Sequence, residues 1–211
     1  MNTYAESSIG KYKLSEGHLL PTSLTRKKFK NVLDVTRATS VFEIGFNAGH
    51  SARMWLDLRK DDPNFRVHSI DIGQHYYTLP LMEELAEQDP RFTYEIIDSQ
   101  DLEPEQVEGY DLLFIDGSHE PDILRSDVIL GSLAEVKYIL VDDYNSRGGF
   151  KYTVRKTVNS IVGDTAFKYC WYSKNVLHYE STGGISQMRL ALSYKAWKRH
   201  TPEEHDGFAK Q

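Results

Sequence analysis

The stretch VFEIGFNAGHS, residues 41–51, decides how the chain folds. Its mostly apolar first half predicts a buried strand, and Gly45 and Gly49 predict a tight turn that opens into a helix. Glycine adopts left-handed backbone conformations and lets a ligand approach the main chain closely. The amino end of a helix carries a partial positive charge, so the turn is a candidate ligand-binding loop.

The same alternation of strand and helix continues along the chain, and a helix is expected before the first strand. Strands are expected at 41–45, 66–71, 92–97, 110–116 and 138–142, and helices at 24–37, 51–58, 79–88, 123–133 and 154–162. Helices of this length between strands indicate βαβ units. The sequence therefore predicts an α/β fold with a Rossmann-like, doubly wound and mostly parallel sheet.

The rhythm changes after about residue 165, where strand patterns follow one another with little helix between them. These patterns cover 167–171, 176–179 and 188–193, and a turn at 181–184 (STGG) separates the last two. This arrangement predicts an antiparallel C-terminal hairpin, with 188–193 beside the fifth strand, and a sheet of seven strands, five parallel and two in the hairpin.

Composition narrows the class of protein. The chain has 211 residues, and 25 Lys and Arg stand against 31 Asp and Glu, a net charge of −6 that disfavours a nucleic-acid partner. No apolar run is long enough to span a membrane, and the first residues lack a signal-peptide pattern. Cys170 is the single cysteine, so no internal disulfide can form. A cytoplasmic protein that makes no membrane contact is the expectation.

The turn at 45–50 does not fit a nicotinamide cofactor. The G-x-G-x-x-G fingerprint would need glycine where Asn47 and His50 stand. An acidic residue, Glu43, precedes the first glycine instead, and Asp71 ends the second strand, where a carboxylate can bind ribose hydroxyls. Taken alone, Asp71 could equally cap a helix, and a glycine turn could be only a turn.

Five ordered segments resemble the class I S-adenosylmethionine-dependent methyltransferases. Glu43 to Gly49 matches the first motif of that family, acidic-x-Gly-x-x-x-Gly, and Asp71 ends the second strand. The segments IIDS (96–99), YDLLFIDGSH (110–119) and YILVDDY (138–144) match its later strand ends, over residues 38–195.

The resemblance implies S-adenosylmethionine as the cofactor. The glycine segment would pass beside the methionine part, Asp71 would bind the ribose, and the segment after the third strand would lie near the adenine. Asn47 stands where the family often has glycine, and asparagine tolerates a left-handed backbone. The implied cofactor-binding residues are Glu43, Gly45, Asn47, Gly49, Ser51, Asp71, Asp98, Ser99 and Asp116.

An acidic cluster is expected beside that cofactor. Asp116 ends the fourth strand, and Asp142 and Asp143 end the fifth. The carboxyl ends of parallel strands meet at one edge, and three neighbouring carboxylates repel one another unless a cation lies between them. Oxygen ligands suit Mg²⁺ or another divalent cation, so these three residues are the candidate metal ligands.

The cluster is similar to that of the metal-dependent O-methyltransferases, which include catechol and macrolide-sugar enzymes. His119 stands where the catechol enzymes carry a lysine base, and the segment at 116–119 (DGSH) resembles a sugar- and antibiotic-modifying subgroup. Histidine titrates near neutral pH and can take a hydroxyl proton. The resemblance therefore implies His119 and Asp116 as catalytic residues.

These observations predict a methyltransferase that methylates a small-molecule or sugar hydroxyl with the help of a divalent cation. Residues 1–40 would form a helical extension or lid, 41–195 the cofactor-binding domain and 196–211 a polar tail. The basic run at 27–30 (KKFK) is expected on a solvated helix face. A nicotinamide oxidoreductase, a non-catalytic cofactor-binding or interaction domain, and a homo-oligomer all stay open.

Overall fold

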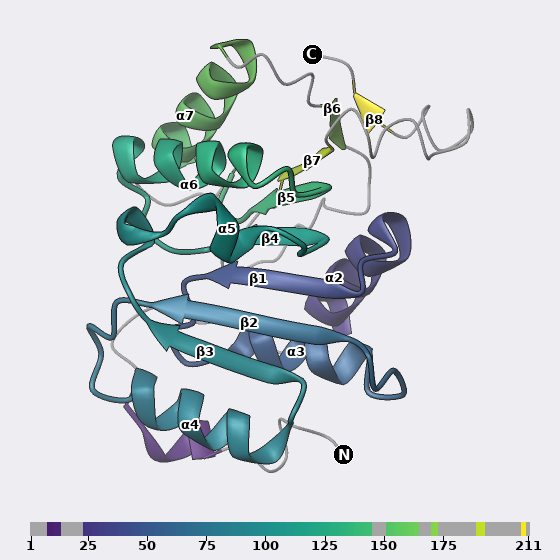
Figure 1. The fold of residues 1–211 in the computed structure, drawn as a ribbon, viewed down its shortest axis with the longest axis vertical. Helices are drawn as coiled ribbons and strands as arrows, with labels where there is room; N and C mark the ends of the chain where they lie inside the picture. Colours follow the sequence, from purple (N-terminus) through teal and green to yellow (C-terminus); the bar gives the residue numbers. More distant parts are fainter. Residues whose placement is uncertain are drawn as a thin grey trace.

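The computed structural model describes residues 8–13, 23–144, 151–164, 170–172, 189–192 and 208–209 (Figure 1). Its strands form one sheet in the order β3-β2-β1-β4-β5-β7-β6-β8. The strands are β1 (Ser40–Ile44), β2 (Arg66–Asp71), β3 (Phe92–Ile96), β4 (Leu112–Ile115), β5 (Tyr138–Val141), β6 (Cys170–Tyr172), β7 (Arg189–Leu192) and β8 (Phe208–Ala209). The helices are η1 (Ser8–Lys11), α2 (Ser23–Thr36), α3 (His50–Leu58), α4 (Thr78–Gln88), η2 (Ser99–Asp101), α5 (Pro104–Val107), α6 (Pro121–Leu133) and α7 (Lys151–Asp164).

Strands β1 to β5 are parallel, which confirms the predicted α/β fold with a mostly parallel sheet. The chain moves outward from β1 through β2 to β3, then returns to place β4 on the other side of β1. The carboxyl ends of β1 and β4 therefore flank the point where strand order reverses. In open α/β sheets, ligands bind in the crevice at that point.

The C-terminal strands pair in the opposite sense. β7 runs antiparallel to β5, with Val141 opposite Arg189, and β6 runs antiparallel to β7. The expected strand at 176–179 and the turn at 181–184 lie outside the described residues. The hairpin that would join 176–179 to 188–193 therefore stays a prediction. Within the described segments the sheet has eight strands rather than seven, because Phe208–Ala209, expected in a polar tail, pairs with β6.

Side-chain alternation divides the sheet into two apolar faces. One face packs against α2, α3 and α4, and the other against α5, α6 and α7; Figure 1 shows α3 behind the sheet and α5 in front of it. The first face is formed by Val41, Val67, Phe92, Leu112, Phe114, Tyr138 and Leu140. The second is formed by Phe42, Ile44, Ile70, Leu113, Ile115, Ile139 and Val141.

Helix α2 is held on the first face by an aromatic cluster. The Phe29 ring centroid lies 4.1 Å from that of Trp55 on α3 and 5.9 Å from that of Phe114 on β4. Val32 and Leu33 are buried beside it, as the helical repeat requires. Among the described helices, none is both long and apolar enough to cross a membrane.

Replacing Phe29 with alanine should detach α2 from the sheet. Deleting a fully buried aromatic ring leaves a cavity, so we expect Phe29→Ala to lower the free energy of unfolding by about 3–5 kcal/mol. Urea denaturation measures this change. Lys30→Ala is the matched control, since Lys30 is exposed on the same helix and its loss should stay within about 0.5 kcal/mol. Equal effects of the two substitutions would contradict the packing role of Phe29.

Candidate active site

The turn after β1 depends on glycine at position 45. Gly45 has φ +97°, and its amide donates to the Ile70 carbonyl over 2.9 Å. A Cβ atom at this position would lie 2.4 Å from the backbone oxygen of Asp116. Only glycine therefore lets the end of β1 pass this close to the end of β4.

Asn47 and Gly49 shape the rest of the turn. Asn47 has φ +50°, a left-handed conformation that asparagine tolerates. Its side-chain oxygen accepts a hydrogen bond from the Tyr77 hydroxyl (2.9 Å), which ties the turn to the start of α4. Gly49, with φ +74°, precedes α3, and a Cβ there would meet the Phe46 ring at 2.3 Å.

Asp71 organises this turn through its carboxylate. Oδ2 accepts hydrogen bonds from the backbone amides of Phe46 (3.0 Å) and Asn47 (2.9 Å), and Oδ1 accepts one from Gly73 (2.8 Å). The sequence predicted that Asp71 binds the ribose of the cofactor, but not that its carboxylate holds the backbone of the turn in place. A carboxylate offers about four acceptor positions, so three backbone bonds leave capacity for a ligand hydroxyl.

Glu43 is a fully buried carboxylic acid at the end of β1, with 0% of its surface exposed. Oε2 accepts a hydrogen bond from the Ser69 hydroxyl, and the Ser51 hydroxyl also stabilises its ionised form. Burial is the larger effect and raises the pKa of Glu43 to about 7, with a further contribution from the charge of Asp71. Oε1 has no hydrogen-bond partner among the described residues.

Strand register places the predicted acidic residues on one face of the sheet. Glu43, Asp116 and Asp142 each follow by two positions a residue of the apolar face that α2 and α3 cover. The Asp116 amide donates to the Ile44 carbonyl (2.9 Å), and the Asp142 amide donates to the Ile115 carbonyl (3.0 Å). These bonds extend the ladder by one residue, so the acidic side chains occupy neighbouring strand ends.

The carboxylates influence one another strongly. Burial, and then the charges of Asp142, Asp143 and Glu43, hold the pKa of Asp116 well above its ordinary value. Asp142 is 6% exposed, and its Oδ1 accepts the Asp143 amide over 2.8 Å. We refer to Asp116, Asp142 and Asp143 as the acidic cluster.

His119 joins this acidic cluster directly. Its Nε2 lies 3.0 Å from Oδ2 of Asp143, and both side chains are partly exposed. The structure thus brings the predicted base to a predicted metal ligand. In this arrangement Asp143 is well placed to orient the imidazole ring.

The donor set of the acidic cluster suits a divalent cation, because carboxylate oxygens are the ligands that Mg²⁺ and Mn²⁺ prefer. Burial first, and then the neighbouring carboxylates, raise the pKa of Asp116. Among the described residues, however, no three His, Cys, Asp or Glu side chains converge with the geometry that holds a metal ion. The three predicted ligands are therefore close enough to interact by charge, without a preformed cage.

The expectation of a solvated face at 27–30 is wrong for Lys28. Lys28 is only 6% exposed, whereas Lys27 and Lys30 are exposed. Desolvation lowers the pKa of Lys28, and the charges of Asp142 and Asp143 oppose this effect. The helical repeat holds the missed signal, since Lys28 lies four residues before the buried Val32 and so on the inward stripe of α2.

The turn after β3 contains Asp98 and Ser99, expected near the adenine. Asp98 is exposed, and its Oδ1 accepts the Gln100 amide over 3.0 Å at the start of η2. Asp127 on α6 is fully buried beneath this turn, and its Oδ2 has no hydrogen-bond partner among the described residues. Burial raises the pKa of Asp127 to about 6, although the Ser99 hydroxyl opposes the shift. No sequence pattern distinguishes Asp127 from a solvated residue of an amphipathic helix.

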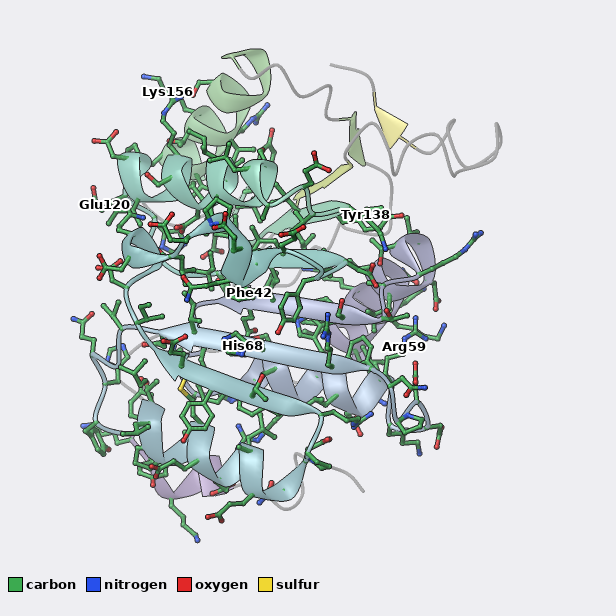
Figure 2. All side chains as sticks on the ribbon, in the orientation of Figure 1. Phe42, Arg59, His68, Glu120, Tyr138 and Lys156 are labelled. Atoms are coloured by element: carbon green, nitrogen blue, oxygen red, sulfur yellow. The ribbon has the colours of Figure 1, made fainter. Side chains whose placement is uncertain are left out.

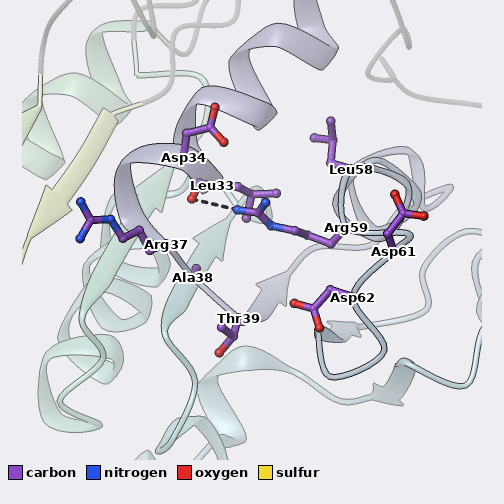
Figure 3. Close-up of a pocket in the computed structure, with 9 residues that line it drawn as sticks. All are labelled: Leu33, Asp34, Arg37, Ala38, Thr39, Leu58, Arg59, Asp61 and Asp62. Atoms are coloured by element: carbon purple, nitrogen blue, oxygen red, sulfur yellow. Dashed lines mark hydrogen bonds between the residues drawn. The ribbon is translucent and has the colours of Figure 1, made fainter.

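A separate hollow of about 570 Å³ lies near the start of β1, at the opposite end of this strand from the glycine turn (Figure 3). Arg59 extends across it and donates to the Leu33 carbonyl over 3.1 Å. Figure 2 shows Arg59 and Tyr138, which starts β5, at one end of the sheet and Glu120, which precedes α6, at the other. The hollow is therefore remote from the acidic cluster.

The family comparison agrees with this geometry. Residues 42–144, from β1 to just past β5, match the profile of a family described as "Methyltransferase domain". Over this stretch the sequence is that of a methyltransferase domain. The resemblance to class I S-adenosylmethionine-dependent methyltransferases, and with it the expected enzyme class, is confirmed. No curated protein sequence matches the chain.

Solved structures share the fold of this methyltransferase. The O-methyltransferase TomG from Streptomyces achromogenes, involved in tomaymycin synthesis and determined in complex with SAM (S-adenosylmethionine), is 16% identical with a TM-score of 0.60 over 83% of this chain and 82% of TomG. An O-methyltransferase from Bacillus cereus in complex with SAH (S-adenosylhomocysteine) is 14% identical, with a TM-score of 0.60 over 87% and 86% of the two chains. An SAH-bound methyltransferase from Podospora anserina is 13% identical, with a TM-score of 0.58 over 92% and 97%. At these identities the likeness establishes the fold.

The raised pKa of Glu43 makes the stability of the methyltransferase depend on pH. Between pH 4.5 and about 7, Glu43 is ionised in the unfolded chain but protonated in the folded one. The free energy of unfolding should therefore fall as pH rises through this window, by at most about 3 kcal/mol. Glu43→Gln should remove this part of the pH dependence, which urea denaturation at several pH values measures. Glu95→Gln, at an exposed position on β3, is the control. A Glu43→Gln profile parallel to the wild type would exclude this role.

Proposed function

We propose that this methyltransferase transfers the methyl group of S-adenosylmethionine to a hydroxyl oxygen of a small molecule or sugar, with a divalent cation at the acidic cluster. The observation that carries the proposal is the meeting of a braced glycine turn with three carboxylates and a histidine at the switch point of the sheet. The O-methyltransferases that share the fold, with SAM or SAH in their structures, support the cofactor and the acceptor atom.

The cofactor would lie along the carboxyl ends of β1, β2 and β3. Asp71, with acceptor capacity to spare, would bind the ribose. Oε1 of Glu43, which has no hydrogen-bond partner within the described segments, is a buried acceptor at the glycine turn, and the ammonium group of the methionine part would donate to it. Asp98 and Ser99 would contact the adenine end.

His119 would act as the general base. It would take the proton of the acceptor hydroxyl at Nδ1, while Asp143 stabilises the imidazolium through Nε2. The acceptor oxygen then forms a bond to the methyl carbon as the carbon–sulfur bond breaks. The electron pair of that bond stays on sulfur, which yields S-adenosylhomocysteine. Holding oxygen and methyl carbon in line supplies much of the acceleration.

The oxygens of Asp116, Asp142 and Asp143 would hold the cation. A divalent cation there would lower the pKa of the acceptor hydroxyl and compensate the mutual repulsion of the carboxylates. A nicotinamide oxidoreductase has no support at the glycine turn, where Asn47 and His50 replace the required glycines. The domain limits, the cytoplasmic location and a homo-oligomer stay predictions.

Cofactor binding tests the first part of the proposal. S-adenosylmethionine and S-adenosylhomocysteine should raise the melting temperature, because a ligand that binds only the folded state stabilises it, whereas NAD should not. Asp71→Asn should weaken the binding measured by calorimetry by about 1–3 kcal/mol, since a bracing acceptor of the turn is lost. Asp61→Asn, at an exposed position after α3, should bind normally. Stabilisation by NAD in place of S-adenosylmethionine would refute the methyltransferase chemistry.

Chelation and two substitutions test the catalytic part. Exhaustive chelation and Asp142→Asn should each reduce methyl transfer by about a hundredfold or more while cofactor affinity stays nearly unchanged, because positioning and charge stabilisation at the acceptor oxygen are lost. His119→Ala should also slow methyl transfer, since a general base contributes about 10²–10⁴ in rate. The assay is transfer of a labelled methyl group to catechols, sugars and nucleosides. Full activity after chelation would remove the cation from the proposal, and full activity of His119→Ala would remove the base.

A further inference from the structure

Asn47 of the glycine turn is held from outside the turn by two consecutive residues at the start of α4. The Tyr77 hydroxyl donates to the side-chain oxygen of Asn47 over 2.9 Å, and the Thr78 hydroxyl donates to its backbone oxygen over 2.9 Å. Tyr77 and Thr78 are both fully buried, with 0% of their surface exposed. Breaking either bond would leave a buried polar group without its partner, so both bonds hold Asn47 firmly.

This support matters because Asn47 adopts an unfavourable backbone conformation. Its φ is +50°, in the left-handed region that residues with a Cβ atom seldom occupy. Such a conformation persists only where the surrounding contacts fix it. Asp71 binds the amide of Asn47 over 2.9 Å, while Tyr77 and Thr78 bind its side chain and its carbonyl. The shape of the glycine turn thus depends on α4 as well as on β2.

The Tyr77 ring is in turn contacted by the N-terminal segment. Tyr12, which follows η1, has its ring centroid 6.2 Å from that of Tyr77 and 5.9 Å from that of Tyr76. The Tyr76 hydroxyl donates a long hydrogen bond to the Lys13 carbonyl over 3.5 Å, which adds a second tie between the two segments. Figure 1 shows η1, in purple, alongside α4. A segment from the start of the chain therefore packs on the residue that holds Asn47.

We propose that Tyr12 is a positioning residue for the glycine turn, and that the N-terminal segment at 8–13 thereby sets the affinity for S-adenosylmethionine. The inference rests on the proposed function in naming the cofactor. Contacts lead from the Tyr12 ring to the Tyr77 ring, and from the Tyr77 hydroxyl to Asn47. Residues 8–13 lie outside the stretch that matches the methyltransferase domain, so this support comes from beyond the matched domain.

The coupling has to act in both directions. If packing of the segment at 8–13 holds the glycine turn in the shape that binds S-adenosylmethionine, cofactor binding must stabilise the packed segment by the same free energy. A tyrosine that only fills space in the core would lower stability without this reciprocal effect. Two measurements therefore separate a positioning role from a purely structural one.

Affinity for S-adenosylmethionine, measured by calorimetry on the full chain, tests the first direction. Tyr77→Phe keeps the ring and removes the hydroxyl, so we expect it to weaken binding about threefold to tenfold. Tyr12→Ala should weaken binding by a similar factor, and Tyr12→Phe should match the wild type because it keeps the ring. The effects of Tyr12→Ala and Tyr77→Phe should not multiply in the double variant, since both act through Asn47. Lys11→Ala, at an exposed position beside Tyr12, is the control.

Hydrogen exchange tests the second direction. We expect S-adenosylmethionine to slow amide exchange at 8–13 in the wild type by about threefold or more, and to slow it less in Tyr77→Phe, where the bond to Asn47 is lost. NAD is the control ligand and should leave exchange at these amides unchanged. Should Tyr12→Ala fail to fold, Tyr12→Leu serves in the calorimetry, because it keeps an apolar side chain and removes the ring.

The outcomes separate this inference from the proposed function. Wild-type affinity in Tyr12→Ala and Tyr77→Phe, or exchange at 8–13 that S-adenosylmethionine leaves unchanged, would overturn the inference and leave the proposed function intact. Equal weakening by Tyr12→Ala and Lys11→Ala would also overturn the assignment to the Tyr12 ring. Failure of S-adenosylmethionine to bind the wild type would instead contradict the proposed function, and this inference with it.

Discussion

The structure depends on the register of β1, β4 and β5 at their carboxyl ends. The Asp116 amide bonded to Ile44 and the Asp142 amide bonded to Ile115 continue the parallel ladder just past the regular strands. Side chains that would otherwise continue the apolar face become Glu43, Asp116 and Asp142 in these last positions. The acidic side chains therefore lie directly next to the core that packs on α2 and α3. Gly45 is required because the backbone of β1 passes close to the backbone of Asp116 there.

Concentrating carboxylates at one edge costs stability, and the protein offsets this cost in several ways. Backbone amides compensate Asp71, the Ser69 hydroxyl bonds to Glu43, and His119 contacts Asp143. Burial raises the pKa of Glu43 and, together with the neighbouring charges, that of Asp116, so both carboxyls ionise less readily. Lys28 adds a positive charge from outside the sheet.

Much of this could be predicted from the sequence because strand and helix periods are local signals. The alternation of apolar runs with amphipathic segments predicted the five parallel strands, and the position of each acidic residue at a strand end predicted that they would gather. The bracing of the turn by Asp71 was not predictable, since it depends on which backbone amides the tertiary fold turns toward β2. Asp127 was missed because a single aspartate on an amphipathic helix resembles a solvated residue until its neighbours are known.

The burial of Lys28 was likewise not predictable from the sequence. Three lysines within four residues looked like a solvated face, but only the rotation of α2 against Phe114 decides which of them is buried. Burial raises the pKa of Glu43 to about 7 and, with the neighbouring carboxylates, holds the pKa of Asp116 above its ordinary value, so an added positive charge would act on their ionisation as well as on geometry. A cationic ligand at these strand ends would lower the pKa values of both carboxyls, so its binding would be coupled to release of protons. The unfavourable electrostatics of the free site and the proposed affinity for a positively charged ligand would thus be two consequences of one arrangement of strand ends.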